Sequence, residues 1–404
     1  MFKKISRCLI YSPALMPLYS IKLVSISIIA CALGSLVNCD YKQLKSLTII
    51  EGIKIIFPYS AVLFLYVISL LWTDNIASGL KYVEYTLSFL IFPLIFLVLK
   101  PLQNNKEIVF FIKSFILSTS LLSFLTLLNV FFKIENVSIP ISDLVRKNIQ
   151  STYLIGEHPI YFSLLLAIGI VLLVFNKFES KLLTFLIYFI NILGIVISGS
   201  RGVFISLFLV SFIIIFLKSL DKRKIITSII LLFFLAGTVV YFSPLKQRMA
   251  QLVTTEKIYP EGLYFNSFNI RMAIYKCSCS IIKDELLIGH GAGDIEKKLT
   301  QCYEEFNTIA FDVQRYNTHN QYFHYLCAFG LVGTIIILYY FGFYLRNAYV
   351  SKNWNHLTIL ILFYLCFLTE NILVRNTGIV VFSMINCIFV LQANLKKNEK
   401  SINS

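Results

Sequence analysis

Long runs of apolar residues recur along almost the whole chain, and they constrain its fold more than any other feature. Runs of about 17 to 25 residues match the length of helix that crosses the hydrocarbon core of a bilayer. Lipid offers backbone groups no hydrogen-bond partner, so only helices or closed barrels can span it. The runs are continuous rather than alternating, which excludes a barrel. The predicted fold is therefore all-α, that of a polytopic integral membrane protein. Eleven strong runs occur at about 20–38, 51–72, 83–99, 107–131, 159–175, 182–198, 202–217, 225–242, 321–344, 356–370 and 377–393.

The composition agrees with a chain that lies mostly in membrane. Its 404 residues are 57% hydrophobic and only 14% charged, against roughly 25% charged in an ordinary soluble domain, and the mean hydropathy is +0.77. The net charge of +15 would suggest nucleic acid in a soluble protein. Here the positive charges lie in loops between apolar runs, where they orient helices in the membrane. We therefore expect membrane lipids, and no nucleic acid, as partners.

One long polar segment interrupts this pattern, between residues 243 and 320. Loops of such length are uncommon in compact proteins and are usually functional or disordered. The segment divides the chain into three parts: helices over residues 1–242, a large loop over 243–320, and three helices with a terminal tail over 321–404.

Lys and Arg in the short loops predict which side of the membrane the long loop faces. The richer side is cytoplasmic by the positive-inside rule, which puts the long loop outside. The richer side holds Lys42, Lys45, Lys100, Lys106, Lys177, Lys181, Lys218, Lys222, Arg223, Lys224, Arg346, Lys352, Lys396, Lys397 and Lys400. The other side holds Lys81, Lys133, Arg146, Lys147, Arg201 and Arg375.

The amino terminus conflicts with eleven spans, because it carries Lys3, Lys4 and Arg7 and should also lie inside. A short additional pass at about 5–18 resolves the conflict and gives about twelve spans with both ends in the cytoplasm. Two prolines in that stretch leave a tilted or re-entrant element as the alternative.

Two arginines on the outer side could bind an anion. Arg201 lies in a Gly- and Ser-rich turn before an apolar run, and helix amino termini together with a guanidinium fork favour phosphate. Arg271 lies near the start of an amphipathic helix in the long loop. The alternatives are that Arg201 anchors a helix end and that Arg271 is a solvated charge.

His319 lies where the long loop joins the next span. A histidine there can be neutral near pH 7 and accept a proton as a general base, although a helix cap is the simpler role. His158, Asn320, Glu370 and Arg375 are secondary candidates. Glu370 and Arg375 flank the last outer turn, where charges are costly unless paired or functional, so an ion pair between them is the alternative.

The nine cysteines show no metal-ligand spacing, so we expect no metal site. Cys277, Cys279 and Cys302 share the long loop, where Cys302 could form a disulfide with either of the others.

The chain resembles the O-antigen ligase family of membrane glycosyltransferases over most of its length. The resemblance is carried by the order and common side of Ser200-Arg201-Gly202, Arg271, Gly289 to Gly293, and His319-Asn320. It implies transfer of a polysaccharide from undecaprenyl diphosphate to a sugar of the lipid A core, at the periplasmic face of the bacterial inner membrane. It also implies that no cofactor, nucleotide or metal takes part. Arg201 and Arg271 would bind the diphosphate, and His319 would act as the base in a direct displacement that inverts the anomeric carbon.

Two other functions remain open on the sequence. A polymerase of the same superfamily would join repeat units on the lipid carrier. A transporter would also suit twelve spans, but transporters often have internal repeats and charges near the bilayer midplane, whereas the charges here gather at one face.

Overall fold

The computed structural model describes residues 2–39, 41–133, 147, 149, 158–218, 221–242 and 257–403. These residues form helices and connecting loops, with two isolated β-bridges near Gly262 and no strand. Within this part, eight helices are long and apolar enough to cross a membrane. The predicted all-α, polytopic membrane fold is therefore confirmed. Arg146 and residues 243–256 of the long loop lie outside the described residues.

The first half of the chain forms the larger part of a helical bundle. Its elements are α1 (Phe2–Ile10), η1 (Ser12–Leu18), α2 (Ile21–Asn38), α3 (Tyr41–Ser46), α4 (Ile49–Ser69), α5 (Ile76–Thr86), α6 (Ser88–Pro93), η2 (Leu94–Leu99), α7 (Asn105–Lys133), α9 (Pro159–Phe175), α10 (Lys181–Ser198), α11 (Arg201–Lys218) and α12 (Lys222–Phe242).

The second half begins with the outer segment, a name we use for residues 257–320, and ends with three long helices. Its elements are α14 (Ser267–Asp284), α15 (Ile295–Tyr303), α16 (Ala310–Val313), α17 (Gln321–Val350), α18 (Trp354–Phe367), η4 (Ile372–Val374) and α19 (Asn376–Asn403).

Each of the eleven apolar runs forms helix in the structure. Eight of the runs lie in the eight candidate membrane spans, and three do not. The runs at 159–175 and 356–370 form the shorter apolar helices α9 and α18, and the run at 225–242 lies in α12. The count of about twelve spans stays a prediction. His356 is buried in the first turn of α18, with Nε2 2.8 Å from Asn386 Oδ1.

The first segment passes from one end of the bundle to the other in two short helices. Arg7 lies 3.6 Å from Glu107, in the first turn of α7. Lys22 shares a cavity with Arg315 and Arg375 at the other end. The nine residues of α1 and seven of η1 would span about 28 Å at the rises of α- and 3₁₀-helices, close to the bilayer core. This geometry favours the additional pass over the re-entrant alternative.

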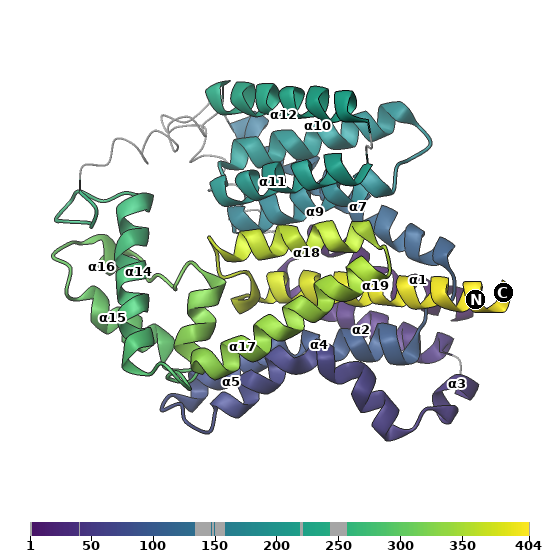
Figure 1. Ribbon diagram of the computed structural model, residues 1–404, viewed down its shortest axis with the longest axis horizontal. Helices are drawn as coiled ribbons and strands as arrows, with labels where there is room; N and C mark the ends of the chain where they lie inside the picture. The colour runs from purple at the N-terminus through teal and green to yellow at the C-terminus, as the bar shows by residue number, and fades with distance from the viewer. Residues whose placement is uncertain are drawn as a thin grey trace.

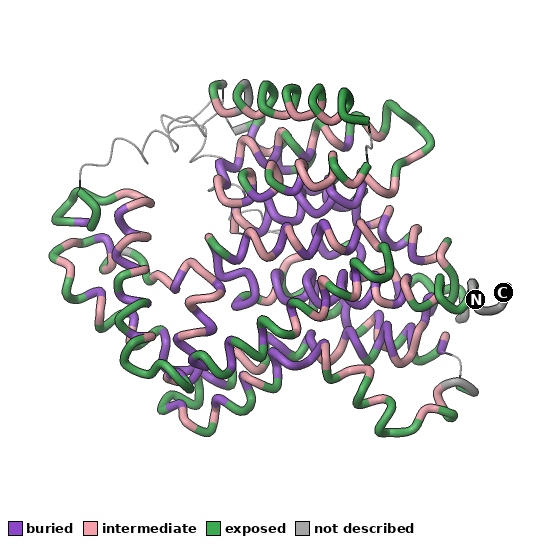
Figure 2. Tube along the Cα trace, viewed as in Figure 1, coloured by how far each residue is buried: buried purple, intermediate pink, exposed green. Residues whose placement is uncertain are grey.

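Figure 1 shows the outer segment beyond the ends of the long helices, opposite the end where both chain termini lie. Figure 2 shows that burial is greatest along the central helices α9, α18 and α19, whereas α12 lies exposed at one edge. In α19, 78% of the apolar stretch is buried inside the protein. The loops that leave these central helices therefore have a rigid base.

The outer segment is fixed by a disulfide and a buried carboxylate. Cys277 is bonded to Cys302, which joins α14 to α15 and decides between the two pairings left open above. Asp294 is 5% exposed and accepts hydrogen bonds from the Thr73 hydroxyl at 2.8 Å and from the backbone N–H groups of residues 74 and 75 at 2.7 and 3.0 Å. The outer segment is thereby tied to the turn between α4 and α5.

Candidate active site

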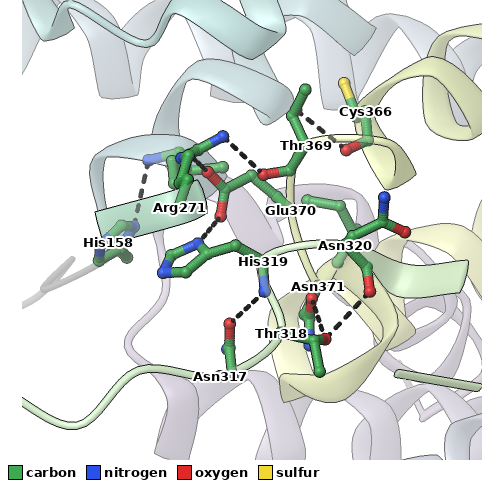
Figure 3. Close-up of polar contacts among 12 residues, drawn as sticks. His158, Arg271, Asn317, Thr318, His319, Asn320, Cys366, Thr369, Glu370 and Asn371 are labelled. Carbon is green, nitrogen blue, oxygen red and sulfur yellow. Dashed lines mark hydrogen bonds and ion pairs between the residues drawn. The ribbon is translucent and has the colours of Figure 1, made fainter. Parts of the chain in front are cut away.

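Glu370 lies at the centre of a polar cluster between the ends of α18, α14 and α17 (Figure 3). One carboxylate oxygen is 3.0 Å from Nδ1 of His319, and the other forms an ion pair with Nη2 of Arg271. Nη1 of Arg271 donates to the backbone carbonyl of Thr369 at 3.1 Å. The structure thus joins three residues that are up to 99 positions apart in sequence.

The backbone at His319 adopts an unusual conformation. Its φ is +42°, in the left-handed region that costs non-glycine residues energy, although histidine is more tolerant than most. The side chain of Asn317 accepts the N–H of His319 at 3.0 Å. The side chains of Thr318 and Asn371 hydrogen-bond to each other across the cluster, at 2.8 and 3.1 Å. These contacts hold the imidazole against the segment that carries Glu370.

Arg201 begins α11 and reaches toward the start of α14. Its Nη2 donates to the Ser267 hydroxyl at 2.6 Å. Glycine is needed on both sides of Arg201. Gly199 has φ +65° and ends α10, while a Cβ at Gly202 would lie 2.4 Å from the Thr369 hydroxyl. Gly202 therefore lets α11 pack directly against the residue before Glu370.

Arg271 is positioned by a well-capped helix. Asn266 accepts from the N–H groups of residues 268 and 269 at 2.8 and 3.2 Å, and Asn269 returns a bond to the cap. Ser267 and Tyr275 lie four residues to either side of Arg271, on the same face of α14. The Tyr275 hydroxyl also contacts the His319 carbonyl at 3.5 Å.

His158 begins α9 beside the same cluster (Figure 3), where its Nδ1 accepts from the N–H of Ile160 at 3.4 Å. Its charge is one of those that act on Glu370. Burial raises the pKa of the Glu370 carboxyl, but the hydrogen bond from His319 and the neighbouring positive charges lower it further, so the pKa lies below its usual value. Glu370 is therefore a carboxylate at neutral pH.

The three side chains of the cluster differ in exposure. Glu370 is 12% exposed, whereas His319 and Arg271 are 23% and 31% exposed. The carboxylate is thus enclosed, while the imidazole and the guanidinium each keep part of their surface accessible.

Two of the secondary candidates have other contacts. Asn320 caps α17, accepting from the N–H groups of residues 322 and 323, and donates to the Leu368 carbonyl at 3.1 Å. Arg375 is exposed and lines a separate cavity. Glu370 pairs with Arg271 and His319, which contradicts the alternative that Glu370 and Arg375 form an ion pair with each other.

Several contacting residues were missed by sequence reasoning. Ser267 and Tyr275 carried a usable signal, since they flank Arg271 at helical spacing. Thr318 and Asn371 carried none, because their contact depends on how α17 packs beside the end of α18.

The described residues contain no group of three or more His, Cys, Asp or Glu placed to hold a metal ion. The cluster supplies instead one imidazole fixed by a carboxylate, with two guanidinium groups nearby. A carboxylate only accepts hydrogen bonds, so it places the proton on Nδ1 and leaves Nε2 with a lone pair. Such an imidazole can act as a general base beside an anion-binding site.

Comparison with known proteins agrees with this chemistry. Residues 186–338 match the family model described as O-antigen ligase, and this stretch includes Arg201, Arg271 and His319. No curated protein matches the chain. The match supports glycosyltransferase-like activity in general. This part of the chain is therefore similar to the O-antigen ligase family.

Proposed function

We propose that this protein transfers a polysaccharide from undecaprenyl diphosphate to a sugar of the lipid A core, at the periplasmic face of the inner membrane. The observation that carries the proposal is the chain of contacts from Arg271 through Glu370 to His319, with Arg201 beside the same helix. The chemistry needs one base and an anion site, and these residues supply both.

His319 is the proposed base. Its Nδ1 is engaged by Glu370, which leaves Nε2 to accept the proton of the acceptor hydroxyl as that oxygen attacks the anomeric carbon. The Glu370 carboxylate then stabilises the imidazolium that forms, as an oriented carboxylate does in other histidine bases. The proton returns to solvent once the product has left.

Arg201 and Arg271 are the proposed diphosphate ligands. As the new carbon–oxygen bond forms, the bond from the anomeric carbon to the phosphate oxygen breaks, and its electron pair leaves with the lipid diphosphate. Two guanidinium groups stabilise the charge that develops on that leaving group. His158 would add to the positive field of the site. Direct displacement inverts the anomeric configuration and requires neither nucleotide nor metal.

The proposed side follows from the loop charges. The cluster lies at the end of the bundle that carries the outer segment, opposite both termini (Figure 1). The positive-inside rule puts the Lys-rich end in the cytoplasm, so the site faces the periplasm, within reach of a diphosphate at the membrane surface.

The test is transfer by purified protein supplied with undecaprenyl-diphosphate glycan and core lipid, with chelator and without nucleotide. We expect product from wild type and from Lys297→Ala, an exposed control in the outer segment. His319→Ala, Arg201→Ala and Arg271→Ala should each lose transfer while inserting normally. Product at wild-type level from His319→Ala would refute the assignment.

A polymerase of the same superfamily is the alternative, and the acceptor separates the two. In a deletion strain, uncapped core with long carrier-linked polymer indicates a ligase, whereas core that bears a single repeat unit indicates a polymerase. The family match favours either enzyme over the transporter.

A further inference from the structure

A second cavity of about 870 Å³ lies next to the His319 segment, on a different set of elements. Its lining comes from α2, α5, α6, α15, η4, the starts of α17 and α19, and the loops before these two helices. Its volume is in the range of small-molecule sites. Neither Arg201 nor Arg271 lines it.

The cavity combines positive charge with an apolar wall. Lys22, Lys81, Arg315 and Arg375 line it, against the carboxylates Glu84 and Glu296. Of these, Arg315 and Glu296 are 3.7 Å apart and both largely exposed, so this pair contributes little binding energy. The remaining lining charges, three cations against one carboxylate, favour an anion.

The apolar wall lies on helices that cross the membrane. Ile29 of α2 and Leu87, between α5 and α6, line the cavity and are 61% and 41% exposed. Both belong to candidate membrane spans. A ligand with an anionic head and a hydrocarbon tail could therefore place its head among the cations and its tail along this wall.

The cavity meets the catalytic segment at two residues. Tyr316 and Asn317 line it. The ring of Tyr316 lies 6.0 Å from that of His319, and Asn317 binds the His319 N–H. The proposed base is thus linked to Arg271 through Glu370, and to the cavity through Tyr316 and Asn317.

We infer that this cavity binds the acceptor, a phosphorylated glycolipid, while the donor diphosphate binds at Arg201 and Arg271. The inference rests on the proposed function, since a transfer between two membrane lipids needs two sites that share one base. Phosphates of the acceptor would contact Lys81 and Arg375, and its sugars would extend past Asn317 toward Nε2 of His319.

The test measures binding, without turnover, to the full-length protein in phosphatidylcholine nanodiscs. The probes are a bis-phosphorylated core lipid without O-polysaccharide, its dephosphorylated form, and undecaprenyl diphosphate. The charge reversal Lys81→Glu with Arg375→Glu should weaken binding of the phosphorylated core lipid at least tenfold and leave undecaprenyl diphosphate within twofold. Arg271→Ala should show the opposite pattern.

Lys297→Glu is the matched control, because it reverses an exposed charge on α15 that does not line the cavity. It should bind all three probes as wild type does. The inference is overturned if the double variant binds the phosphorylated core lipid normally, if it loses undecaprenyl diphosphate equally, or if wild type binds the dephosphorylated form as tightly. Failure of transfer by wild type would instead refute the proposed function and leave these affinities unaffected.

Discussion

The substitution Glu370→Gln removes the negative charge of this side chain and keeps its size, so it tests what the charge contributes. Glutamine has the same length, but it cannot stabilise a positive imidazole as a carboxylate does. The Glu370 side chain is 12% exposed and lies 3.0 Å from His319 Nδ1, so solvent screens this contact little. Hydrogen bonds to charged groups contribute about 1.5–3 kcal/mol. If the whole of that is lost in the transition state, kcat falls about 10- to 150-fold.

The donor KM should respond differently from kcat. Arg271 forms an ion pair with Glu370, so removing the carboxylate charge should strengthen the electrostatic attraction between Arg271 and the diphosphate. We therefore expect KM for the lipid-linked donor to stay level or to fall while kcat drops. The assay is initial-rate transfer at varied donor concentration, with Glu285→Gln, an exposed carboxylate of the outer segment, as the control.

Two results would contradict this account of Glu370. A kcat within threefold of wild type would mean that the carboxylate does not assist the base. A donor KM that rises together with the fall in kcat would indicate a disrupted site, in which Glu370 has only a structural role.

Four further outcomes follow from the same structure. Gly202→Ala should lower the melting temperature and the activity, because its Cβ would lie 2.4 Å from the Thr369 hydroxyl, and overpacking costs about 1–3 kcal/mol; Thr369→Ala should restore part of both. Asp294→Ala should lower the melting temperature measured by thermal shift, since it removes three hydrogen bonds from a buried carboxylate. Cys302→Ser should abolish the mobility shift on reducing gels and destabilise the outer segment by about 3.5 kcal/mol in the chain-entropy picture. The pKa of Glu370 is lower in the folded protein than in the unfolded chain. The charged carboxylate therefore contributes its full stability above the ordinary glutamate pKa of about 4.3, and this stability is lost as pH falls through the lower folded pKa. The melting temperatures of wild type and Glu370→Gln should converge in that acidic range.

The helices were predictable because the membrane imposes strong local rules. Each apolar run corresponds to a helix, since a segment in lipid must satisfy its own backbone. The apolar run at 159–175 and the run after Arg201 both begin helices where the sequence predicts them. Proline at the first helical turn and the Gly-Ser turn before Arg201 are local signals that do not depend on packing.

The contacts of the cluster were not predictable in the same way. A local reading pairs Glu370 with Arg375, five residues away, whereas the structure pairs it with Arg271 and His319. The segment between Glu370 and Arg375 explains why these two residues do not pair. The short helix η4 is fixed by a bond from the Leu373 N–H to the Gln321 side chain at 2.7 Å, and beyond it Arg375 lines the other cavity. Only the packing of η4 against α17 determines that outcome.

The strained backbone of His319 strengthens the distinction that the Glu370→Gln experiment draws. A left-handed residue other than glycine costs about 1–3 kcal/mol and persists only when its surroundings hold it. Here the Asn371 amide donates a hydrogen bond to the Thr318 hydroxyl, and the Asn320 amide donates one to the backbone carbonyl of Leu368, just after α18. Both contacts join the segment that carries the proposed base to the segment that carries Glu370, one on each side of the His319–Glu370 pair. The imidazole therefore stays beside residue 370 whether or not that residue is charged, and a loss of rate on removing the charge reports electrostatics rather than a displaced base.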